Sequence, residues 1–405
     1  MAPDGSGSDM KTIVASYAAE LGFDLVQVAS AEDFTEDQNV ALERLRAGLM
    51  DGLPWYTEAR IRRGTSPQEL LPGARSIICL GVNYYQPDKP GPPPGNPAGK
   101  VARYARGRDY HKPMKNQMRA YVEGLRVVLD TPFAARWYVD DGPMLDRAAA
   151  RRSGLGWTGK NTNLLAPNLG SWVFLGQVIT DLEMEADPPL RKSCGACVRC
   201  IDACPTGAIV APYTVDNARC ISYLTIENRG PIPAELRPQM QDWVFGCDIC
   251  QDICPVNRKA ISSESVRWRM EPGPFLQRGR TEGPAQPGPE SLDLVGLLEM
   301  SEEEFRRRFQ GTPILRAKRA GLQRNACVAL GNRLEAAAVP ALRRALLNGE
   351  SLVRGHAAWA LGRIGTAEAQ QALDEARVEE MDHQVLEEIA DAQGAPSLRP
   401  ESRTP

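Results

Sequence analysis

The chain has 405 residues, 42% of them hydrophobic, and a formal net charge of −3. This length is sufficient for about two or three domains with their own cores, and a pI near 5.9 gives no global signature of nucleic-acid binding. The composition excludes a membrane-spanning chain, because no run approaches the roughly 18 apolar residues of a span. The N-terminus has no apolar core of a signal peptide, so we expect a cytoplasmic protein.

The first part of the chain mixes helical and strand patterns. Amphipathic periodicity predicts helices over residues 11–21 and 115–129. Alternating or continuously apolar runs predict strands over residues 23–29, 76–84, 137–140 and 171–180. This alternation predicts a layered α/β or α+β domain over residues 1–182. The Pro/Gly-rich stretch from Gln86 to Lys100 is expected to be a surface excursion of that domain.

Eight of the ten cysteines lie between Cys194 and Cys254. The first run has the C-x2-C-x2-C-x3-C-P spacing of bacterial ferredoxins, whose fourth cysteine binds a second cluster. The second run lacks its first cysteine, because Val244 stands there, and Cys220 is the nearby candidate to replace it. We therefore predict a ferredoxin-like domain over residues 183–270 with two [4Fe-4S] clusters, one bound by Cys194, Cys197, Cys200 and Cys254, and the other by Cys204, Cys220, Cys247 and Cys250.

Two alternatives to the clusters are structural zinc sites and a disulfide framework. Zinc usually takes paired C-x2-C knuckles with longer gaps, and disulfides need an oxidising compartment. Both therefore fit the spacing less well than iron–sulfur ligation. Cys79 and Cys327 lie outside the set, in apolar runs, and are expected to be small buried hydrophobic residues.

The C-terminal part has a different organisation. A Pro/Gly-rich segment over residues 271–289 predicts a domain boundary, and Ala-Leu-Gly at residues 329–331 recurs after 31 residues. Alanine-rich units of this period predict HEAT-like helical repeats over residues 290–395, followed by a disordered tail. Between Phe305 and Arg333 there are eight basic and no acidic residues, which indicates either a phosphate-binding stretch or a solvated helical face.

An iron–sulfur pair transfers electrons but does not itself carry out bond chemistry on a substrate. No G-x-G-x-x-G fingerprint follows a predicted strand, and the three histidines, His111, His356 and His383, are too scattered for a histidine-based metal centre. A separately bound redox cofactor is therefore expected.

Several motifs resemble one known family. The segments from Tyr138 to Arg147 and from Gly154 to Leu165 are similar to the core motif of epoxyqueuosine reductases. The similarity continues in register through residues 71–76, 103–111, 170–176 and 220–227, both cysteine runs and the Arg-Asn helical unit at residues 324–325. It implies an α+β protein with an N-terminal α/β cobalamin-binding reductase domain, a ferredoxin-like domain and HEAT-like repeats.

The resemblance also implies a reaction and a set of residues. The family reduces epoxyqueuosine to queuosine in the anticodon loop of tRNA, using cobalamin and two [4Fe-4S] clusters. The cobalamin is expected to be base-off, because Asp109-Tyr-His111 lacks the glycine of the Asp-x-His-x-x-Gly motif. Its contacts would be Arg63, Arg103, Tyr104, Asp140, Thr162, Leu164, Ser222, Glu227 and Asp248.

Removing an epoxide oxygen requires a positioned acid, and Asp140 matches the family's proton donor. Burial against the corrin would raise the pKa of its carboxyl. Asp141 is the competing assignment, since adjacent residues of a strand point to opposite faces, and a cap for the turn at Gly142 is the structural alternative. The tRNA contacts would be Arg229, Arg316, Lys318, Arg319 and Arg324.

Two other functions are compatible with the cysteine pattern. One is a corrinoid reductase of a small organohalide, and the other is a non-enzymatic electron-transfer protein. The absent leader and the basic stretch favour the tRNA enzyme. We expect a monomer with no membrane partner that receives electrons from an unidentified donor.

Overall fold

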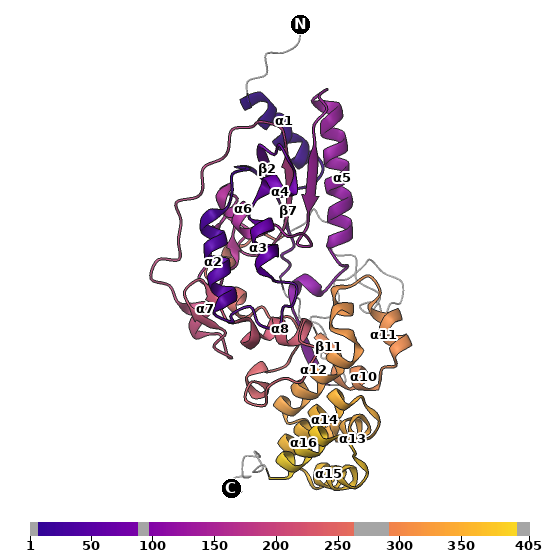
Figure 1. Ribbon diagram of the computed structural model, residues 1–405. Helices are drawn as coiled ribbons and strands as arrows, with labels where there is room; N and C mark the ends of the chain where they lie inside the picture. The colour runs from indigo at the N-terminus through magenta and orange to yellow at the C-terminus, as the bar shows by residue number, and fades with distance from the viewer. Residues whose placement is uncertain (1–6, 88–96, 263–290, 395–405) are drawn as a thin grey trace. The chain divides into compact units, whose positions relative to one another are not determined.

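The computed structural model describes residues 7–87, 97–262 and 291–394 (Figure 1). These residues belong to two compact units, each assembled from separate segments of the chain. The first unit comprises residues 1–87, 109–218 and 249–271, and the second comprises residues 88–108, 219–248 and 272–405. The predicted linker over residues 271–289, the tail after Ala395 and residues 88–96 of the Pro/Gly-rich stretch lie outside the described residues.

A four-stranded antiparallel sheet forms the centre of the first unit. Its strands are β1 (Leu25–Ser30), β2 (Ser76–Asn83), β7 (Val173–Thr180) and β4 (Ala135–Tyr138), in that order across the sheet. All eight residues of β2 are buried, which explains its continuously apolar sequence. The predicted strands are therefore confirmed, except that β4 ends at Tyr138, two residues before the predicted end.

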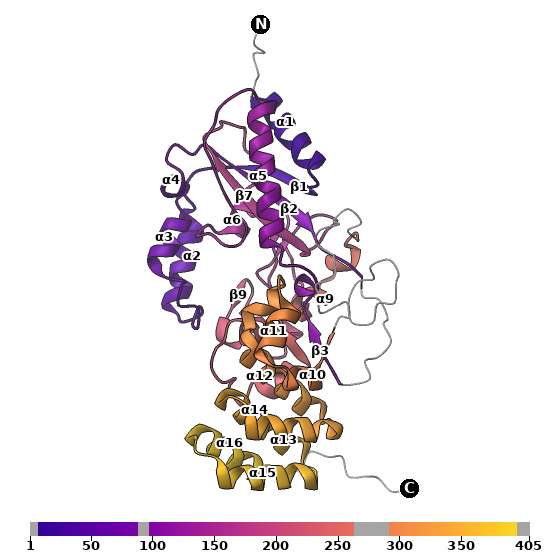
Figure 2. The ribbon, with the colours of Figure 1, turned by 90° about the vertical axis from the view of Figure 1, so that its right-hand side faces the viewer.

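Helices cover both faces of this sheet. On one face, α1 (Gly7–Glu20) and α5 (His111–Val128) lie side by side, with Tyr17 stacked on Tyr121 (Figure 2). Gly176 of β7 leaves room for Met118 of α5, since a Cβ there would lie 2.6 Å from the methionine sulfur. On the other face, α6 (Asp146–Arg152) packs on Ile77 and Ile179. Further helices of this unit are α2 (Thr35–Arg46), α3 (Glu58–Gly64) and α4 (Pro67–Leu70).

Short elements carry the cysteine segments of the first unit. They are the hairpin β5 (Trp157–Thr158) and β6 (Leu164–Leu165), α7 (Arg199–Asp202), the hairpin β8 (Ile209–Ala211) and β9 (Thr214–Val215), α9 (Ile249–Asp252) and η4 (Asn257–Lys259). The side chain of Asn257 accepts from the Ser171 amide (2.7 Å) and donates to the Gln251 carbonyl (2.8 Å). It therefore ties the second cysteine run to the segment before β7.

The second unit combines a small sheet with helices. The sheet order is β10 (Trp243–Phe245), β3 (Ala98–Val101) and β11 (Ser291–Asp293). The helical elements are η1 (Arg103–Ala105), α8 (Ile221–Ile226), η3 (Arg237–Met240), α10 (Leu294–Glu299), α11 (Glu302–Phe309), η6 (Pro313–Ala317), α12 (Lys318–Arg333), η7 (Ala336–Ala338), α13 (Val339–Asn348), α14 (Ser351–Ile364), α15 (Ala367–Glu379) and α16 (His383–Gly394).

The predicted repeat is confirmed, and its glycines explain it. The helices α12, α14 and α16 pack in succession (Figure 1). Gly331 of α12 meets Ala360 of α14, and Gly362 of α14 meets Ala392 of α16. A Cβ at Gly362 would lie 2.7 Å from the Ala392 Cβ, so only glycine allows this approach. The recurring Ala-Leu-Gly therefore places the same close contact in successive repeats.

The repeats also hold the segment over residues 219–248. The Arg324 guanidinium donates to the carbonyls of Leu224 (2.6 Å) and Gly230 (2.6 Å), and the Asn325 amide donates to that of Val244 (2.9 Å). These buried bonds keep residues 219–248 in the same compact unit as the repeats. The compact units thus divide the chain differently from the predicted boundary of a 183–270 domain.

We expect Gly362→Ala to lower the free energy of unfolding by about 1–3 kcal/mol, because overpacking against Ala392 outweighs the gain in helix propensity. Gly321→Ala in α12 is the matched control, since a Cβ there meets nothing within 4 Å. It should be neutral or stabilise by up to about 1 kcal/mol. Denaturant unfolding of both variants tests this, and equal effects at the two positions would contradict the packing argument.

Candidate functional site

The residues between β4 and α6 form a loop, which we call the Asp140 loop (residues 139–146). Asp140 has a φ of +52°, so the chain turns there and the predicted strand over residues 137–140 is wrong at its end. Asp140 and Asp141 are both exposed. They do not lie in a strand with side chains on opposite faces, because the chain turns at Asp140. A left-handed aspartate is uncommon and costs backbone free energy, which the contacts around the loop must offset.

One contact is made by the side chain of Asp140 itself. The Tyr110 hydroxyl donates to Asp140 Oδ2 at 2.9 Å. The Tyr110 ring is only 7% exposed and lies between Phe174, with ring centroids 4.0 Å apart, and His111, at 4.2 Å. His111 in turn approaches the carboxylate of Asp109 at 2.6 Å. The phenol is therefore fixed by stacking, and it orients the Asp140 carboxyl.

Other contacts hold the remainder of the Asp140 loop. Lys115 of α5 forms an ion pair with Asp141, whose second oxygen accepts from the Val139 amide at 3.0 Å. The Arg60 guanidinium donates to the Gly142 carbonyl. Gly64 packs so closely on the loop that a Cβ there would lie 1.8 Å from the Pro143 carbonyl oxygen. Asp141 is thus engaged in holding the loop.

Asp146 ends the Asp140 loop and begins α6. Its Oδ1 is buried and has no hydrogen-bond partner among the described residues. Burial raises the pKa of Asp146 to about 8, and the nearby charge of Asp140 raises it further. The Gln177 amide of β7 donates to the backbone carbonyl of Asp146 at 3.3 Å. Burial therefore favours the protonated form of the Asp146 carboxyl.

Three other predicted cofactor contacts lie in the first unit. Thr162 has a φ of +67°, and its carbonyl accepts from Arg147 at 3.3 Å. Leu164 of β6 is 6% exposed. Arg63 is exposed on α3, and it is Arg60, one turn earlier, that contacts the Asp140 loop.

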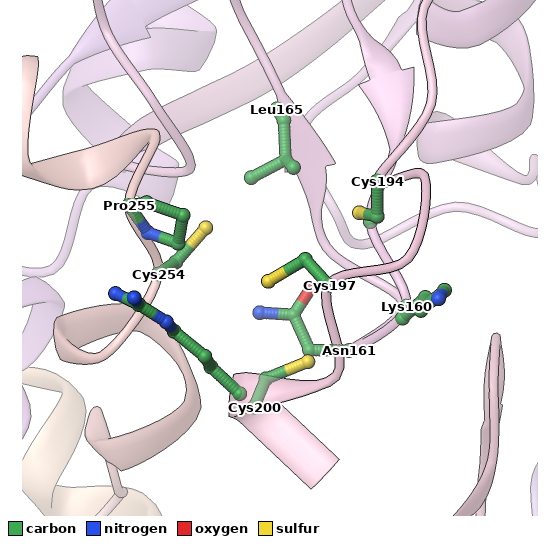
Figure 3. Close-up of a pocket in the computed structure, with 10 residues that line it drawn as sticks. Lys160, Asn161, Leu165, Cys194, Cys197, Cys200, Cys254 and Pro255 are labelled. Atoms are coloured by element: carbon green, nitrogen blue, oxygen red, sulfur yellow. The ribbon is translucent and has the colours of Figure 1, made fainter.

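The first set of cysteines lines one pocket in the first unit (Figure 3). Cys194 and Cys197 lie on a turn that Gly195 allows with a φ of +53°, and Cys200 lies on α7. Cys254 follows α9, and Figure 3 shows the four side chains around a shared space. Lys160 donates to the Gly195 carbonyl at 2.8 Å and also lines the pocket.

The thiols of this pocket influence one another. Burial raises the pKa of Cys200, and the charges of Cys194, Cys254 and Cys197 raise it further; burial and the charges of Cys194 and Cys197 likewise raise the pKa of Cys254. Among the described residues, no group of three or more His, Cys, Asp or Glu is arranged around a single metal ion.

The second set of cysteines is divided between the units. Cys204 and Cys250 belong to the first unit, and Cys220 and Cys247 belong to the second. Their common ligation stays a prediction. Cys79 and Cys327 are fully buried, as expected, and burial raises the pKa of Cys79 to about 12.

The remaining predicted cofactor contacts lie in the second unit. The Arg103 amide donates to Asp248 at 2.7 Å, and the Arg103 guanidinium lies 3.7 Å from the same carboxylate. Asp248 is 1% exposed, so this pair is buried. Tyr104 packs on Phe245, with centroids 6.2 Å apart, and Ser222 is half-buried on α8.

Glu227, after α8, joins two of the predicted tRNA contacts. It forms an ion pair with Arg316 and lies 3.9 Å from Arg229, and both arginine side chains are about half exposed. Lys318 follows Arg316 by two residues, has a φ of +62° and is exposed. Arg319 is more engaged, because it pairs with Glu350 (2.6 Å) and Glu302 (3.3 Å).

Arg324 requires a correction. Its side chain has no exposed surface, and it donates to the carbonyls of Leu224, Asn228 and Gly230. Burial, with the charge of Arg229, lowers the pKa of Arg324 to about 9. A buried side chain that organises the backbone does not contact a phosphate, so the expected tRNA contact at Arg324 is wrong. Its role is to hold the turn that carries Glu227 and Arg229.

Sequence reasoning missed four residues that shape the Asp140 loop. Tyr110 and Asp146 stand inside two of the motifs quoted above, residues 103–111 and 138–147, and this membership was a usable signal. Arg60 and Lys115 carry no such signal, because only the fold brings α3 and α5 to the loop.

Comparisons with known proteins identify all three parts of the chain. A family model described as epoxyqueuosine reductase QueG, DUF1730, matches residues 64–141. A 4Fe-4S double cluster binding domain matches residues 193–257, and HEAT repeats match residues 312–393. Among the described helices, none combines the length and hydropathy that crossing a membrane requires.

Similar proteins cover nearly the whole chain. An epoxyqueuosine reductase of Xanthomonas campestris pv. campestris is 38% identical over 88% of this chain and 97% of that protein. One of Bacillus cereus is 33% identical over 94% and 96%, respectively. A crystal structure of epoxyqueuosine reductase with an epoxyqueuosine-modified tRNA-Tyr stem loop matches with a TM-score of 0.83 and 29% identity, over 96% of this chain and 99% of that chain. A Bacillus subtilis structure, with its catalytic aspartate loop swung out of the active site, also has a TM-score of 0.83, with 28% identity over 96% of this chain and 99% of that chain.

Loss of one ligand should remove one cluster. We expect Cys254→Ser to lower the bound iron from about eight to about four atoms per chain, because the first pocket loses a thiolate. Cys79→Ala is the matched control, since Cys79 is buried in β2 away from the pocket. Iron analysis and electron paramagnetic resonance of the reduced proteins test this. Equal iron in Cys254→Ser and Cys79→Ala would refute the ligand assignment.

Asp146 should make stability depend on pH. Its pKa is about 8 in the folded protein against 3.8 ordinarily, so the unfolded state binds fewer protons between these values. The free energy of unfolding should therefore fall as the pH rises from about 4 to about 8. Asp146→Asn should remove this loss, and its stability relative to wild type should rise by about 2–4 kcal/mol between about pH 5.5 and pH 8. Urea unfolding at about pH 5.5 and 8 measures it; a difference independent of pH would exclude a protonated Asp146.

Proposed function

Because the chain belongs to the epoxyqueuosine reductase family, and is therefore an oxidoreductase, we propose that it reduces epoxyqueuosine to queuosine in the anticodon loop of tRNA. Besides family membership, one structural observation supports this proposal: Asp140 is exposed, and the Tyr110 hydroxyl donates a hydrogen bond to its carboxyl. The family resemblance assigns the proton donor to the same residue.

Removing the oxygen of an epoxide leaves an alkene and releases water. It consumes two electrons and two protons, and oxygen leaves readily only when it is protonated. Asp140 is suited to give the proton, because it is exposed and a hydrogen bond from Tyr110 orients its carboxyl. Asp141 is less suited, because Lys115 and the Val139 amide engage its carboxylate.

The redox group would be base-off cobalamin, and the chain's donors fit such a group. When bound, such a group would supply the reducing chemistry that the strained ring requires. The amide groups around a corrin need hydrogen-bond donors and acceptors, and Arg103 and Glu227 offer them in the second unit. His111 is already engaged by Asp109 and stacked on Tyr110, so we do not expect it to hold the cofactor.

The two clusters would deliver the electrons singly from a donor protein. The pocket of Cys194, Cys197, Cys200 and Cys254 supports one of them, and the match to a double-cluster domain supports the second. Lys160 and Arg199 line the first pocket, and their positive charges would stabilise the anionic cluster.

The substrate would be bound by basic residues of the second unit. Arg229 and Arg316 share Glu227 and keep about half of their side-chain surface exposed, so they are available to phosphates together with Lys318. Arg319 would contribute less, because Glu350 and Glu302 already pair with it. A solved relative bound to a modified tRNA stem loop supports this class of partner. Recognition of an unstacked anticodon base needs such backbone contacts together with a pocket.

Replacing Asp140 and Asp141 one at a time shows which of the two aspartates is the acid. With cobalamin, clusters and a reductant present, Asp140→Asn should lower the rate of queuosine formation roughly 10²- to 10⁴-fold, because the amide cannot donate the proton. Asp141→Asn keeps Asp140 and loses only a loop contact, so we expect a fall of about tenfold or less. Single-turnover assays on epoxyqueuosine-containing tRNA measure both rates. The reverse order would assign the acid to Asp141.

A further inference from the structure

The first cysteine pocket reaches the surface of its unit. Its four cysteines are half-buried, and several of their neighbours in the chain are exposed. These exposed neighbours are Ser193, Gly195, Ala196, Val198 and Arg199. A redox group held by the four thiols is therefore accessible to a second protein that brings electrons.

Two basic side chains line this pocket. They are Lys160, which follows β5, and Arg199, the first residue of α7. The Lys160 ammonium donates to the Gly195 carbonyl at 2.8 Å, so it lies beside the turn of the first cysteine run (Figure 3). Positive charge is thus present at the mouth of the pocket itself.

Two further basic residues stand just before the first cysteine run. Lys192 Nζ lies 5.4 Å from the centroid of the Trp157 ring in β5, which places this charge beside the segment that leads to Lys160. Arg191 precedes it, and at most about 11 Å separates the Cα atoms of Arg191 and Cys194, because three residues of chain cannot span more. We call Lys160, Arg191, Lys192 and Arg199 the basic rim.

The charge around the pocket is locally positive, although the whole chain carries −3. Residues 188–201 include three basic and no acidic residues. Exposed acids stand at Asp202 of α7 and Asp252 of α9, and exposed basic residues at Arg258 and Lys259 of η4 follow the second run. No ion pair of a basic-rim side chain with a carboxylate occurs within the described ranges of the chain.

An apolar side chain lies within this charged surface. Val198, between Cys197 and Arg199, is 41% exposed. Electron-transfer partners associate through small interfaces, below about 1,200 Å², in which charges at the edge steer the encounter and apolar groups make the central contact. A positive rim around an exposed valine fits a partner with a negative surface, and it would repel a basic one.

We propose that the basic rim is the docking surface of an acidic one-electron carrier protein, which is the electron donor of this chain. The inference rests on the proposed function. In each encounter the reduced carrier is oxidised by one electron, and the cluster of the first pocket is reduced by that electron. Two encounters supply the two electrons that one epoxide consumes together with two protons.

Charge reversal in the basic rim tests the docking surface on the cluster-loaded protein. Two acidic carriers, a flavodoxin and a [2Fe-2S] ferredoxin, are separate probes, and a basic cytochrome c is the charge control. At low ionic strength, Arg191→Glu and Lys192→Glu should each raise the Kd of at least one acidic carrier roughly 3- to 10-fold, and about 0.3 M salt should reduce the difference. Lys192→Gln should have an intermediate effect, because it loses the same contact with Trp157 but does not add a negative charge.

Arg119→Glu is the matched control. Arg119 is exposed on α5 of the same unit, so this variant makes the same charge change away from the pocket. It should leave the Kd of both carriers unchanged, and all variants should keep the iron content and the electron paramagnetic resonance spectrum of the wild type. Failure of both acidic carriers to bind the wild type, tighter binding of the cytochrome, or equal Kd values in the rim variants and Arg119→Glu would overturn the inference.

The choice of reductant separates this inference from the proposed function. With dithionite, a small reductant that needs no docking surface, wild type and rim variants should form queuosine at the same rate. With a limiting amount of the reduced carrier, the rate of the rim variants should fall by the factor measured in Kd. An inactive wild type with dithionite would refute the proposed function, whereas equal carrier-driven rates in all variants would refute only the docking surface.

Discussion

The chemistry proposed for this chain depends on how the Asp140 loop is held. A left-handed aspartate at the end of an edge strand is not a favourable conformation by itself. Three helical or near-helical segments fix it: Arg60 of α3 on the Gly142 carbonyl, Lys115 of α5 on Asp141, and Tyr110 before α5 on Asp140. Of these three described contacts, the hydrogen bond from Tyr110 is the one made to the Asp140 carboxyl itself.

The helical repeats have a second role besides presenting basic residues. Arg324 and Asn325 lie inside the second unit and bond to backbone carbonyls of residues 224–244, so they shape the turn that carries Glu227 and Arg229. His356 of α14 adds to this by accepting from the Ile232 amide at 3.1 Å, and burial lowers the pKa of His356, which keeps the ring neutral for that bond. The groups proposed to bind tRNA are thus positioned by buried polar side chains of the repeats. Breaking such a buried network is costly, because the remaining partners lose their hydrogen bonds.

The sequence predicted the parts of the molecule that follow local rules. Spacing of the cysteines located the pocket of Cys194, Cys197, Cys200 and Cys254, and the Ala-Leu-Gly period located the repeats, because a few adjacent residues carry each signal. Sequence reasoning failed where the environment of a side chain is set by residues far away in the chain. Basic charge alone did not distinguish Arg324, which is buried, from Arg316, which is half exposed. The left-handed turn at Asp140 and the contact of Arg60 with Gly142 arise from tertiary packing, which periodicity does not report.

The central claim is that cysteine-bound clusters and a corrinoid act with a carboxylic acid on a tRNA nucleoside. The most direct test is nucleoside mass spectrometry of an epoxyqueuosine-containing anticodon stem-loop after anaerobic incubation with the reduced, cluster-loaded protein, with and without cobalamin. The account predicts queuosine in stoichiometric or greater amounts only when cobalamin is present, accompanied by a change in the visible corrinoid bands on binding. Queuosine formation at the same rate without any corrinoid, or none with cobalamin and both clusters bound, would contradict it.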